Sequence, residues 1–104
     1  MGSGGFGTGG LAGIRLRSYQ ERVREKITTA WTVPPQSQGL QAVVFLVITR
    51  SGQVDQLRLL QHSGNPLFDE SLQRAIKQAQ PLPALPDDYS GSFLEVELRF
   101  RPRG

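Results

Sequence analysis

The sequence predicts an α+β domain in which two helices pack on one face of a three-stranded, antiparallel-type sheet. Two segments repeat apolar residues at the three- and four-residue spacing of a helix. Three other segments are rich in β-branched residues or alternate with period two, as strands do. These segments follow one another in the chain order α-β-β-α-β, and a length of 104 residues suits one domain with one core.

The N-terminus is very rich in glycine, so residues 1–14 are expected to form a flexible leader. This leader is either an addition to the natural chain or the end of a natural linker, and the domain then spans residues 15–102. The first helix is expected over about Arg15–Trp31, where Ser18 and Glu21 have the spacing of a capping box. Its apolar stripe consists of Tyr19, Val23, Ile27, Ala30 and Trp31.

The first strand is expected over Leu40–Thr49 and at the centre of the sheet. Its run Ala42–Ile48 is apolar on both faces, so it needs cover on both sides or contact with another subunit. A tight turn at Arg50–Gln53 leads to the second strand, Val54–Gln61. The blurred alternation of this strand is typical of an edge strand or of one that carries a bulge.

The second helix is expected to begin at Asn65, an N-cap residue, followed by a first-turn proline, Pro66. After it, the proline-rich, turn-rich segment Pro81–Ser92 is incompatible with a regular helix or a central strand. The third strand is expected over Phe93–Arg101. If this strand lies beside the first, the spatial order is 2-1-3 and the third strand is a free edge.

Composition and charge limit the possible functions. The chain is 38% hydrophobic and 20% charged, with a net charge of +3 and a pI near 10.0, which is ordinary for a globular domain. It has no cysteine and one histidine, which excludes disulfides and Cys-ligated metals and argues against multi-histidine metal sites. The longest apolar run is too short to span a bilayer, and no signal peptide is recognisable, so any membrane anchor is expected in a longer parent.

Three groups of side chains are weak candidates for catalysis: His62 beside Ser63, the pair Asp69-Glu70, and the pair Asp87-Asp88. Neighbours in sequence seldom converge as catalysis requires. We therefore expect neither an enzyme nor a cofactor or metal site. An enzyme would require a pocket that gathers His62 with two carboxylates.

A nucleic-acid-binding module is the alternative function, because ten of the twelve basic residues are arginine. The two basic clusters are Arg15, Arg17, Arg22, Arg24 and Lys26 on the first helix and Arg99, Arg101 and Arg103 at the last strand. Acidic residues interrupt both clusters: Glu21, Glu25, Glu95 and Glu97. A solvated surface with salt bridges is the preferred interpretation, and no nucleic-acid partner is expected.

The free edge of the third strand is the strongest functional feature, because unpaired backbone N–H and C=O groups can accept a strand from another protein. The outward side chains would select the partner. The expected partner-binding residues are Phe93, Leu94, Glu95, Val96, Glu97, Leu98, Arg99 and Phe100. An open edge also permits a strand-exchanged homodimer.

Several motifs resemble one family. They are the helical stripe ending at Trp31, the turn Ser51-Gly52-Gln53-Val54, the stretch from Ser63 to Asp69 that reads SGNPLFD, and the closing Phe100-Arg101-Pro102. Together they resemble the C-terminal domain of the TonB/TolA cell-envelope energy transducers over about residues 18–102. Residues Pro81-Leu82-Pro83 and the closing F-x-P are more similar to the TolA-like branch.

The resemblance implies a periplasmic domain of an inner-membrane-anchored protein, reached through a linker and anchor that this chain lacks. It implies coupling of inner-membrane energy to outer-membrane partners, either in envelope integrity of the Tol-Pal kind or in TonB-dependent uptake. The implied partners are TolB-like or Pal-like proteins or a TonB-dependent transporter, with colicins and phage coat proteins as parasites. The family's edge strand corresponds to Phe93–Phe100.

Overall fold

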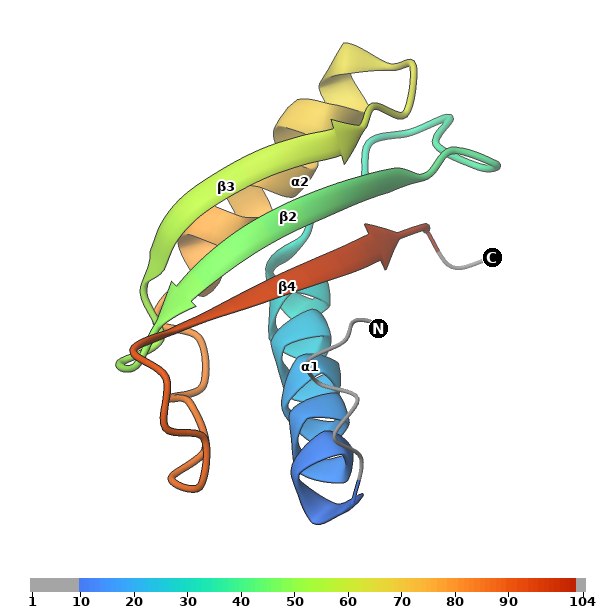
Figure 1. Ribbon diagram of the computed structural model, residues 1–104. Coiled ribbons are helices and arrows are strands. Elements are labelled where there is room, and N and C mark those ends of the chain that lie inside the picture. The colour runs from blue at the N-terminus through green and yellow to red at the C-terminus, as the bar shows by residue number, and fades with distance from the viewer. Residues whose placement is uncertain (1–9, 103–104) are drawn as a thin grey trace.

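The computed structural model describes residues 10–102, and its side chains are described for residues 16–102. The elements follow the order α1, β2, β3, α2 and β4, which confirms the predicted chain order. Their bounds are Gly10–Ala30, Ala42–Thr49, Val54–Gln61, Pro66–Ala79 and Phe93–Phe100. Both helices lie on the same side of the sheet, with α2 behind β3 and α1 beside β4 (Figure 1). Among these residues, no helix is long and apolar enough to cross a membrane.

The sheet has the order β3-β2-β4, so the predicted order 2-1-3 and the central place of the first strand are confirmed. Both neighbours of β2 are antiparallel to it. The register of β3 shifts between Val43 and Val44 and again between Val47 and Ile48. These two irregularities confirm the bulge that the blurred alternation predicted, whereas β4 pairs with β2 without interruption.

The start of the first helix differs from the prediction. Helix α1 begins at Gly10, and Ser18 lies inside it, so the capping-box interpretation of Ser18 and Glu21 is wrong. Once a helix is nucleated, each added residue gains a hydrogen bond at little further cost, so α1 continues into the glycine-rich segment. The expectation of flexibility for residues 1–9 lies outside the described residues.

The N-terminus of α2 follows the prediction. The Asn65 side chain accepts a hydrogen bond from the Leu67 amide at 3.0 Å, and Pro66 occupies the first turn. Gly64, which directly precedes Asn65, has a φ of +94, a conformation that other residues rarely adopt. The Asp69 carboxylate accepts from the Ser63 amide at 3.1 Å, which fixes the turn between β3 and α2.

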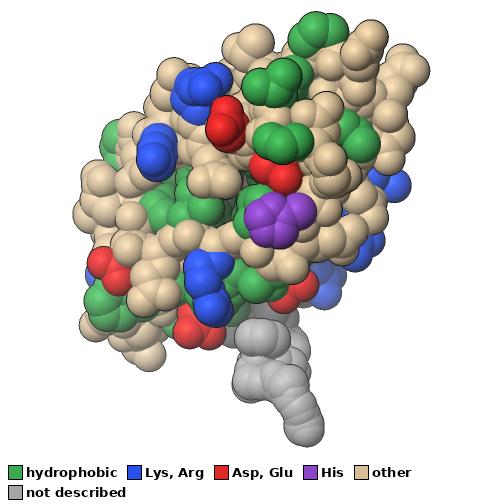
Figure 2. All heavy atoms as spheres, turned by 90° about the horizontal axis from the view of Figure 1, so that it is seen from above, with side chains coloured by type: hydrophobic (Ala, Val, Ile, Leu, Met, Phe, Trp, Pro, Cys, Tyr) green, Lys and Arg blue, Asp and Glu red, His purple; other side chains and the backbone are tan. Residues whose placement is uncertain are grey.

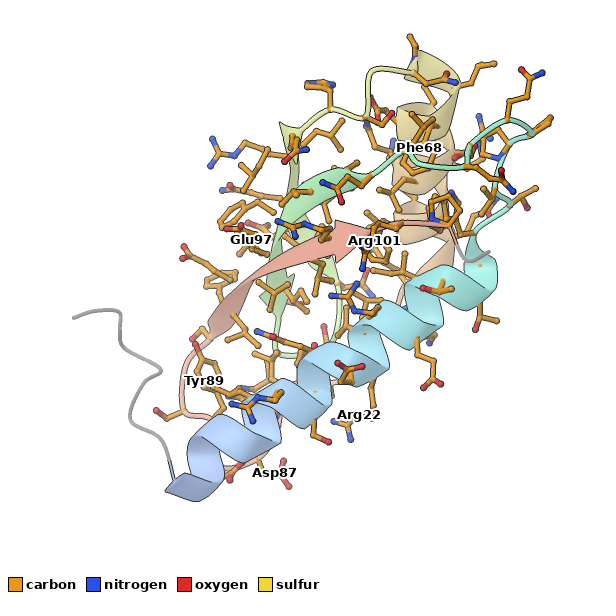
Figure 3. All side chains as sticks on the ribbon, turned by 90° about the vertical axis from the view of Figure 1, so that its right-hand side faces the viewer. Arg22, Phe68, Asp87, Tyr89, Glu97 and Arg101 are labelled. Atoms are coloured by element: carbon orange, nitrogen blue, oxygen red, sulfur yellow. The ribbon has the colours of Figure 1, made fainter. Side chains whose placement is uncertain are left out.

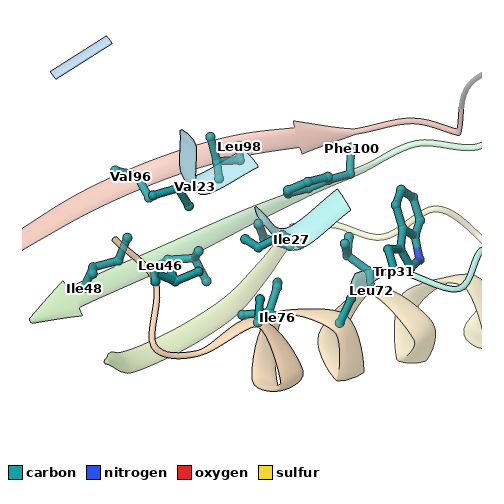
Figure 4. Packing of buried hydrophobic residues seen from close by; sticks show 14 of the residues in the cluster. Val23, Ile27, Trp31, Leu46, Ile48, Leu72, Ile76, Val96, Leu98 and Phe100 are labelled. Atoms are coloured by element: carbon teal, nitrogen blue, oxygen red, sulfur yellow. The ribbon is translucent and has the colours of Figure 1, made fainter. Parts of the chain in front are cut away.

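The core lies between the helices and the sheet (Figure 4). Trp31, which directly follows α1, contacts Phe68 and Phe100 edge-to-face at centroid distances of 5.3 and 6.0 Å. Its indole N–H donates to the Ser71 hydroxyl at 2.9 Å, which leaves no buried donor unpaired there. Trp31 therefore joins both helices and β4.

The face of β2 opposite the helices has no second layer over it in the described part of the chain, and its contact with a second subunit stays a prediction. Val43 and Val47 are only 6% and 8% exposed, although neither helix lies on that side. The guanidinium of Arg58 from β3 lies 5.2 Å from the ring centroid of Phe45. Long polar side chains of the flanking strands can cover apolar surface in this way, with their charged ends in water.

The segment between α2 and β4 has no helix or strand, as predicted, but it contributes Leu82 and Leu85 to the core. The Leu82 amide donates to the Gly52 carbonyl at 2.8 Å, which attaches this segment to the β2–β3 turn. Gly52 has φ +94, and a Cβ there would meet the Leu82 carbonyl oxygen at 2.0 Å. Glycine is thus required at this turn for two reasons.

Candidate partner-binding site

The predicted binding residues all lie on β4, which is an edge strand among the described residues because it pairs only with β2. Exposure alternates as predicted. Leu94, Val96, Leu98 and Phe100 are buried against the helices, and Phe93, Glu95, Glu97 and Arg99 are exposed. Phe93, at 51% exposure, is a large apolar side chain in water. Partner binding by these residues stays a prediction.

The direction of the backbone groups of β4 follows from the β2–β3 turn. Thr49 of β2 donates its amide to Gln53 at 2.8 Å and accepts from the Gly52 amide at 2.9 Å. In an antiparallel strand both backbone groups of a residue point to the same neighbour, and successive residues alternate. Odd-numbered residues of β2 therefore bond to β3, and even-numbered residues bond to β4.

The register pairs even-numbered residues of β2 with even-numbered residues of β4, for example Leu46 with Val96. Even-numbered residues of β4 thus direct their amides and carbonyls to β2. Odd-numbered residues direct theirs to the outer edge, and two side-chain bonds agree with this assignment. The Tyr89 hydroxyl donates to the Phe93 carbonyl at 2.7 Å, and the Arg24 guanidinium donates to the Arg99 carbonyl.

These two bonds define the accessible part of the edge. Figure 3 shows Tyr89 near one end of β4, Arg101 beyond the other end, and Glu97 on the strand between them. The outward carbonyls of Glu95 and Glu97 lie between the two occupied carbonyls and accept no bond in the described part of the chain. An added strand would find its free acceptors there.

Arg24, Tyr89 and Arg50 donate hydrogen bonds to the backbone of β4 or of the segment before it, and the sequence analysis did not assign them to the site. Arg50 follows β2 and donates to the carbonyls of Pro86, Tyr89 and Gly91, the Gly91 distance being 2.7 Å. These bonds fix the segment that leads into β4. The only signal in the sequence was an arginine next to a turn, which is too common to be informative.

The other edge of the sheet, β3, is less suited to strand addition. Its two bulges interrupt the even spacing of backbone groups that an added strand would need. The Val54 amide at its start is already bonded to the Gln80 side chain at 2.9 Å. The two edges therefore differ, and β4 is the regular one.

One shallow hollow of about 360 Å³ gathers His62 with Asp69 and Glu70, the combination that an enzyme would require. His62 Nδ1 lies 3.4 Å from the Asp69 carboxylate, and the histidine side chain is 74% exposed. Figure 2 shows this histidine on the surface beside acidic side chains. The Ser63 hydroxyl is engaged with the Asn65 backbone instead of His62. No three metal-ligating side chains group together in the described part.

Several basic side chains of the predicted clusters are used within the domain. Arg22 lies over the Tyr19 ring at 5.8 Å, and Lys26 donates to the Pro81 carbonyl at 2.6 Å. Arg24 lies 5.4 Å from the Phe100 ring centroid. These contacts direct the cations to the protein itself, which disfavours a continuous phosphate-binding face.

Tyr19 is the one group among the described side chains with a clear pKa shift. Burial raises the pKa of its phenol to about 12, and the nearby Arg22 charge partly opposes this rise. The hydroxyl donates to the Pro83 carbonyl at 2.8 Å. Tyr19 therefore attaches α1 to the segment that leads into β4.

The comparisons with known proteins agree with the fold. A family described as TonB C terminal matches residues 16–100. No curated protein matches the chain. The fold is similar to the solution structure of TolAIII bound to a peptide derived from the N-terminus of TolB, with a TM-score of 0.70 and 20% identity, over 100% of this chain and 80% of the other. It is also similar to the solution structure of the Helicobacter pylori TonB C-terminal domain, with a TM-score of 0.59 and 16% identity. This similarity covers 82% of this chain and 92% of the other.

Proposed function

Because this chain belongs to the TonB C-terminal family, we propose that it is a non-catalytic docking domain that binds a segment of a partner protein along β4. The domain is periplasmic and belongs to a protein anchored in the inner membrane. It couples inner-membrane energy to an outer-membrane partner. The observation that carries the proposal is the regular outer edge of β4, where the carbonyls of Glu95 and Glu97 accept no bond from the described residues.

A TolB-like or Pal-like protein is the preferred partner, and a TonB-dependent transporter is the other candidate within the same proposal. The similarity to TolAIII supports this preference, since it extends over the whole chain with the higher TM-score. That structure contains a TolB-derived peptide. Colicins and phage coat proteins would use the same edge as parasites.

The mechanism follows from the backbone directions. A partner segment would exchange hydrogen bonds with the odd-numbered residues of β4, while the even-numbered residues keep the bonds to β2 and the core packing. Docking would then leave the core unchanged. The exposed side chains of Phe93, Glu95, Glu97 and Arg99 would select the partner.

A proline pair tests this mechanism. Glu97→Pro removes an amide that points to the outer edge, so the domain should stay folded and lose binding. Val96→Pro removes an amide that bonds to β2 and should cost about 3 kcal/mol or more of stability. Glu97→Gln keeps the amide and is the matched control for the lost charge.

The measurement is an amide NMR titration with a synthetic peptide of the TolB N-terminus, with a TonB-box peptide of a transporter as the second probe. The largest shifts are expected within residues 93–100, and Glu97→Pro should weaken binding at least about tenfold while keeping the native spectrum. Shifts confined to the arginines of α1, with binding that weakens steeply with salt, would instead support the nucleic-acid-type surface. Undiminished binding by Glu97→Pro would refute strand addition at β4.

A further inference from the structure

The charges along the outer edge are ordered by sign. Glu95 and Glu97 come first on β4, and Arg99 and Arg101 follow at the same alternate spacing, which places them on one face of the strand. All four side chains are exposed, and none forms an ion pair within the described part of the chain. The edge therefore has a negative half and a positive half, and both are available to a partner.

The surroundings of the edge keep the two halves distinct. The residues of β2 that lie opposite the first three charged positions are apolar, so they neutralise none of the charges: Val47, Phe45 and Val43. From α1, the Arg24 guanidinium donates to the Arg99 carbonyl and adds a further positive charge to the same end of the edge. Figure 3 shows the two signs apart, with Glu97 on β4 and Arg101 beyond its end.

The backbone determines which residues of an added strand meet these charges. Both pairings within the sheet are antiparallel, and antiparallel pairing is slightly more stable per residue, so we take an added strand to run antiparallel to β4. Odd-numbered residues of β4 point their amides and carbonyls outward, so Glu95 and Glu97 would form hydrogen-bonded pairs with the residues directly opposite. Directly opposite side chains lie on the same face and interact, so basic residues fit opposite the two glutamates. Acidic residues, earlier in the added strand, fit opposite Arg99 and Arg101.

We propose that the partner segment of this domain is an extended strand with two acidic residues followed by two basic residues at alternate positions, and that it binds antiparallel to β4. This inference rests on the proposed docking function and names the chemistry of the segment that docks. The hydrogen bonds accept any extended backbone, whereas the four charge pairs select the segment, its direction and its register. A shift of two residues in either direction loses one pair and brings like charges together at another.

Three synthetic peptides of equal length test the proposal by amide NMR titration of the domain. The ordered peptide has two glutamates followed by two lysines at alternate positions, with threonine and valine between them. The mixed peptide has the same composition in the order Glu, Lys, Glu, Lys, and the neutral peptide has glutamine at all four positions. At low salt the ordered peptide should bind about tenfold more tightly than either of the others, and added salt should reduce this difference.

A change in the protein should invert the preference. The variant E97R/R99E keeps the net charge but makes the signs alternate along the edge, so it should bind the mixed peptide more tightly than the ordered one. The control E25R/R74E exchanges two exposed charges on the helices and should keep the preference of the unmodified chain. The milder variant E95Q/E97Q introduces no new charge and should lower the affinity for the ordered peptide about threefold. Amide NMR spectra verify the fold of each variant.

The direction of the bound strand has its own measurement. A spin label at the N-terminus of the ordered peptide should broaden the amide signals near Arg101, and broadening near Phe93 instead would overturn the antiparallel arrangement. Equal affinities for the ordered and mixed peptides would overturn the selection by charge order. In that case, binding of the neutral peptide at β4 would leave the docking function standing. If no peptide shifts the signals of β4, both proposals fail.

Discussion

Gly52 offers the sharpest test of how the turn between β2 and β3 supports the rest of the fold. Gly52 and Gly64 have the same φ of +94. A Cβ at Gly64 would meet nothing within 4 Å, whereas a Cβ at Gly52 would lie 2.0 Å from the Leu82 carbonyl oxygen. The two alanine variants therefore share the backbone strain and differ in the collision.

The expected costs follow from these contacts. Gly64→Ala should lower the free energy of unfolding by about 1–2 kcal/mol, the cost of an L-residue in a left-handed conformation. Gly52→Ala should have the same backbone strain and two further costs. It should displace the buried Leu82, and it should weaken the 2.8 Å hydrogen bond from the Leu82 amide to the Gly52 carbonyl. A lost hydrogen bond contributes about 1 kcal/mol, and disturbed core packing contributes roughly 1–3 kcal/mol. The difference between the variants should therefore be about 2 kcal/mol or more.

Urea unfolding followed by the fluorescence of Trp31, the single tryptophan, measures both variants. Gly39→Ala is a third variant, since Gly39 also has positive φ and open space around it; it should behave like Gly64→Ala. Equal costs for Gly52→Ala and Gly64→Ala would show that a Cβ at Gly52 does not displace Leu82, and the proposed attachment of the segment between α2 and β4 to this turn would be refuted.

Two further predictions concern the contacts that α1 and Arg50 make with the segment between α2 and β4. The pKa of Tyr19 is raised from 10.0 to about 12, so the native state keeps its phenol proton longer than the unfolded chain; the stabilisation is fully present below pH 10 and is lost as pH rises towards 12. Chemical unfolding at several alkaline pH values should show this loss, and Tyr19→Phe should abolish that part of the pH dependence. Arg50→Ala removes the three bonds to the segment before β4, so amide hydrogen exchange at residues 86–91 should accelerate at least about tenfold while the centre of β2 stays protected; unchanged exchange would contradict the role of Arg50.

Periodicity predicted the elements because each one places its apolar residues at the spacing of its own geometry. The clean alternation of β4 and the doubly apolar run of β2 were enough to rank the strands as edge and centre, and the structure confirms both. The start of α1 was predicted too late, at Arg15 instead of Gly10. Glycine propensity and a capping motif are local preferences, and an already formed helix overrides them.

The details of the candidate site depend on contacts between distant parts of the chain, which local patterns do not contain. Arg24 and Arg99 are 75 positions apart, and Arg50 reaches carbonyls 36 to 41 positions away. A carbonyl acceptor is present at every residue, so no sequence pattern marks the one that an arginine will find. The alternation of β4 predicts which side chains are exposed, but the limits of the free edge require the fold.

Under the proposed docking function, the asymmetry between the two sheet edges would let one domain offer a binding strand without aggregating at both sides. The bulges of β3 disturb its edge, while the side chains of Tyr89 and Arg24 occupy acceptors towards the two ends of β4. What remains is a short regular stretch at Glu95 and Glu97, whose carboxylates form no ion pair with the described side chains and would repel any segment of the same charge. An added strand would therefore have to match both the free backbone groups and the charges at these positions, and this double requirement would give specificity to an interaction whose hydrogen bonds alone would accept almost any extended chain.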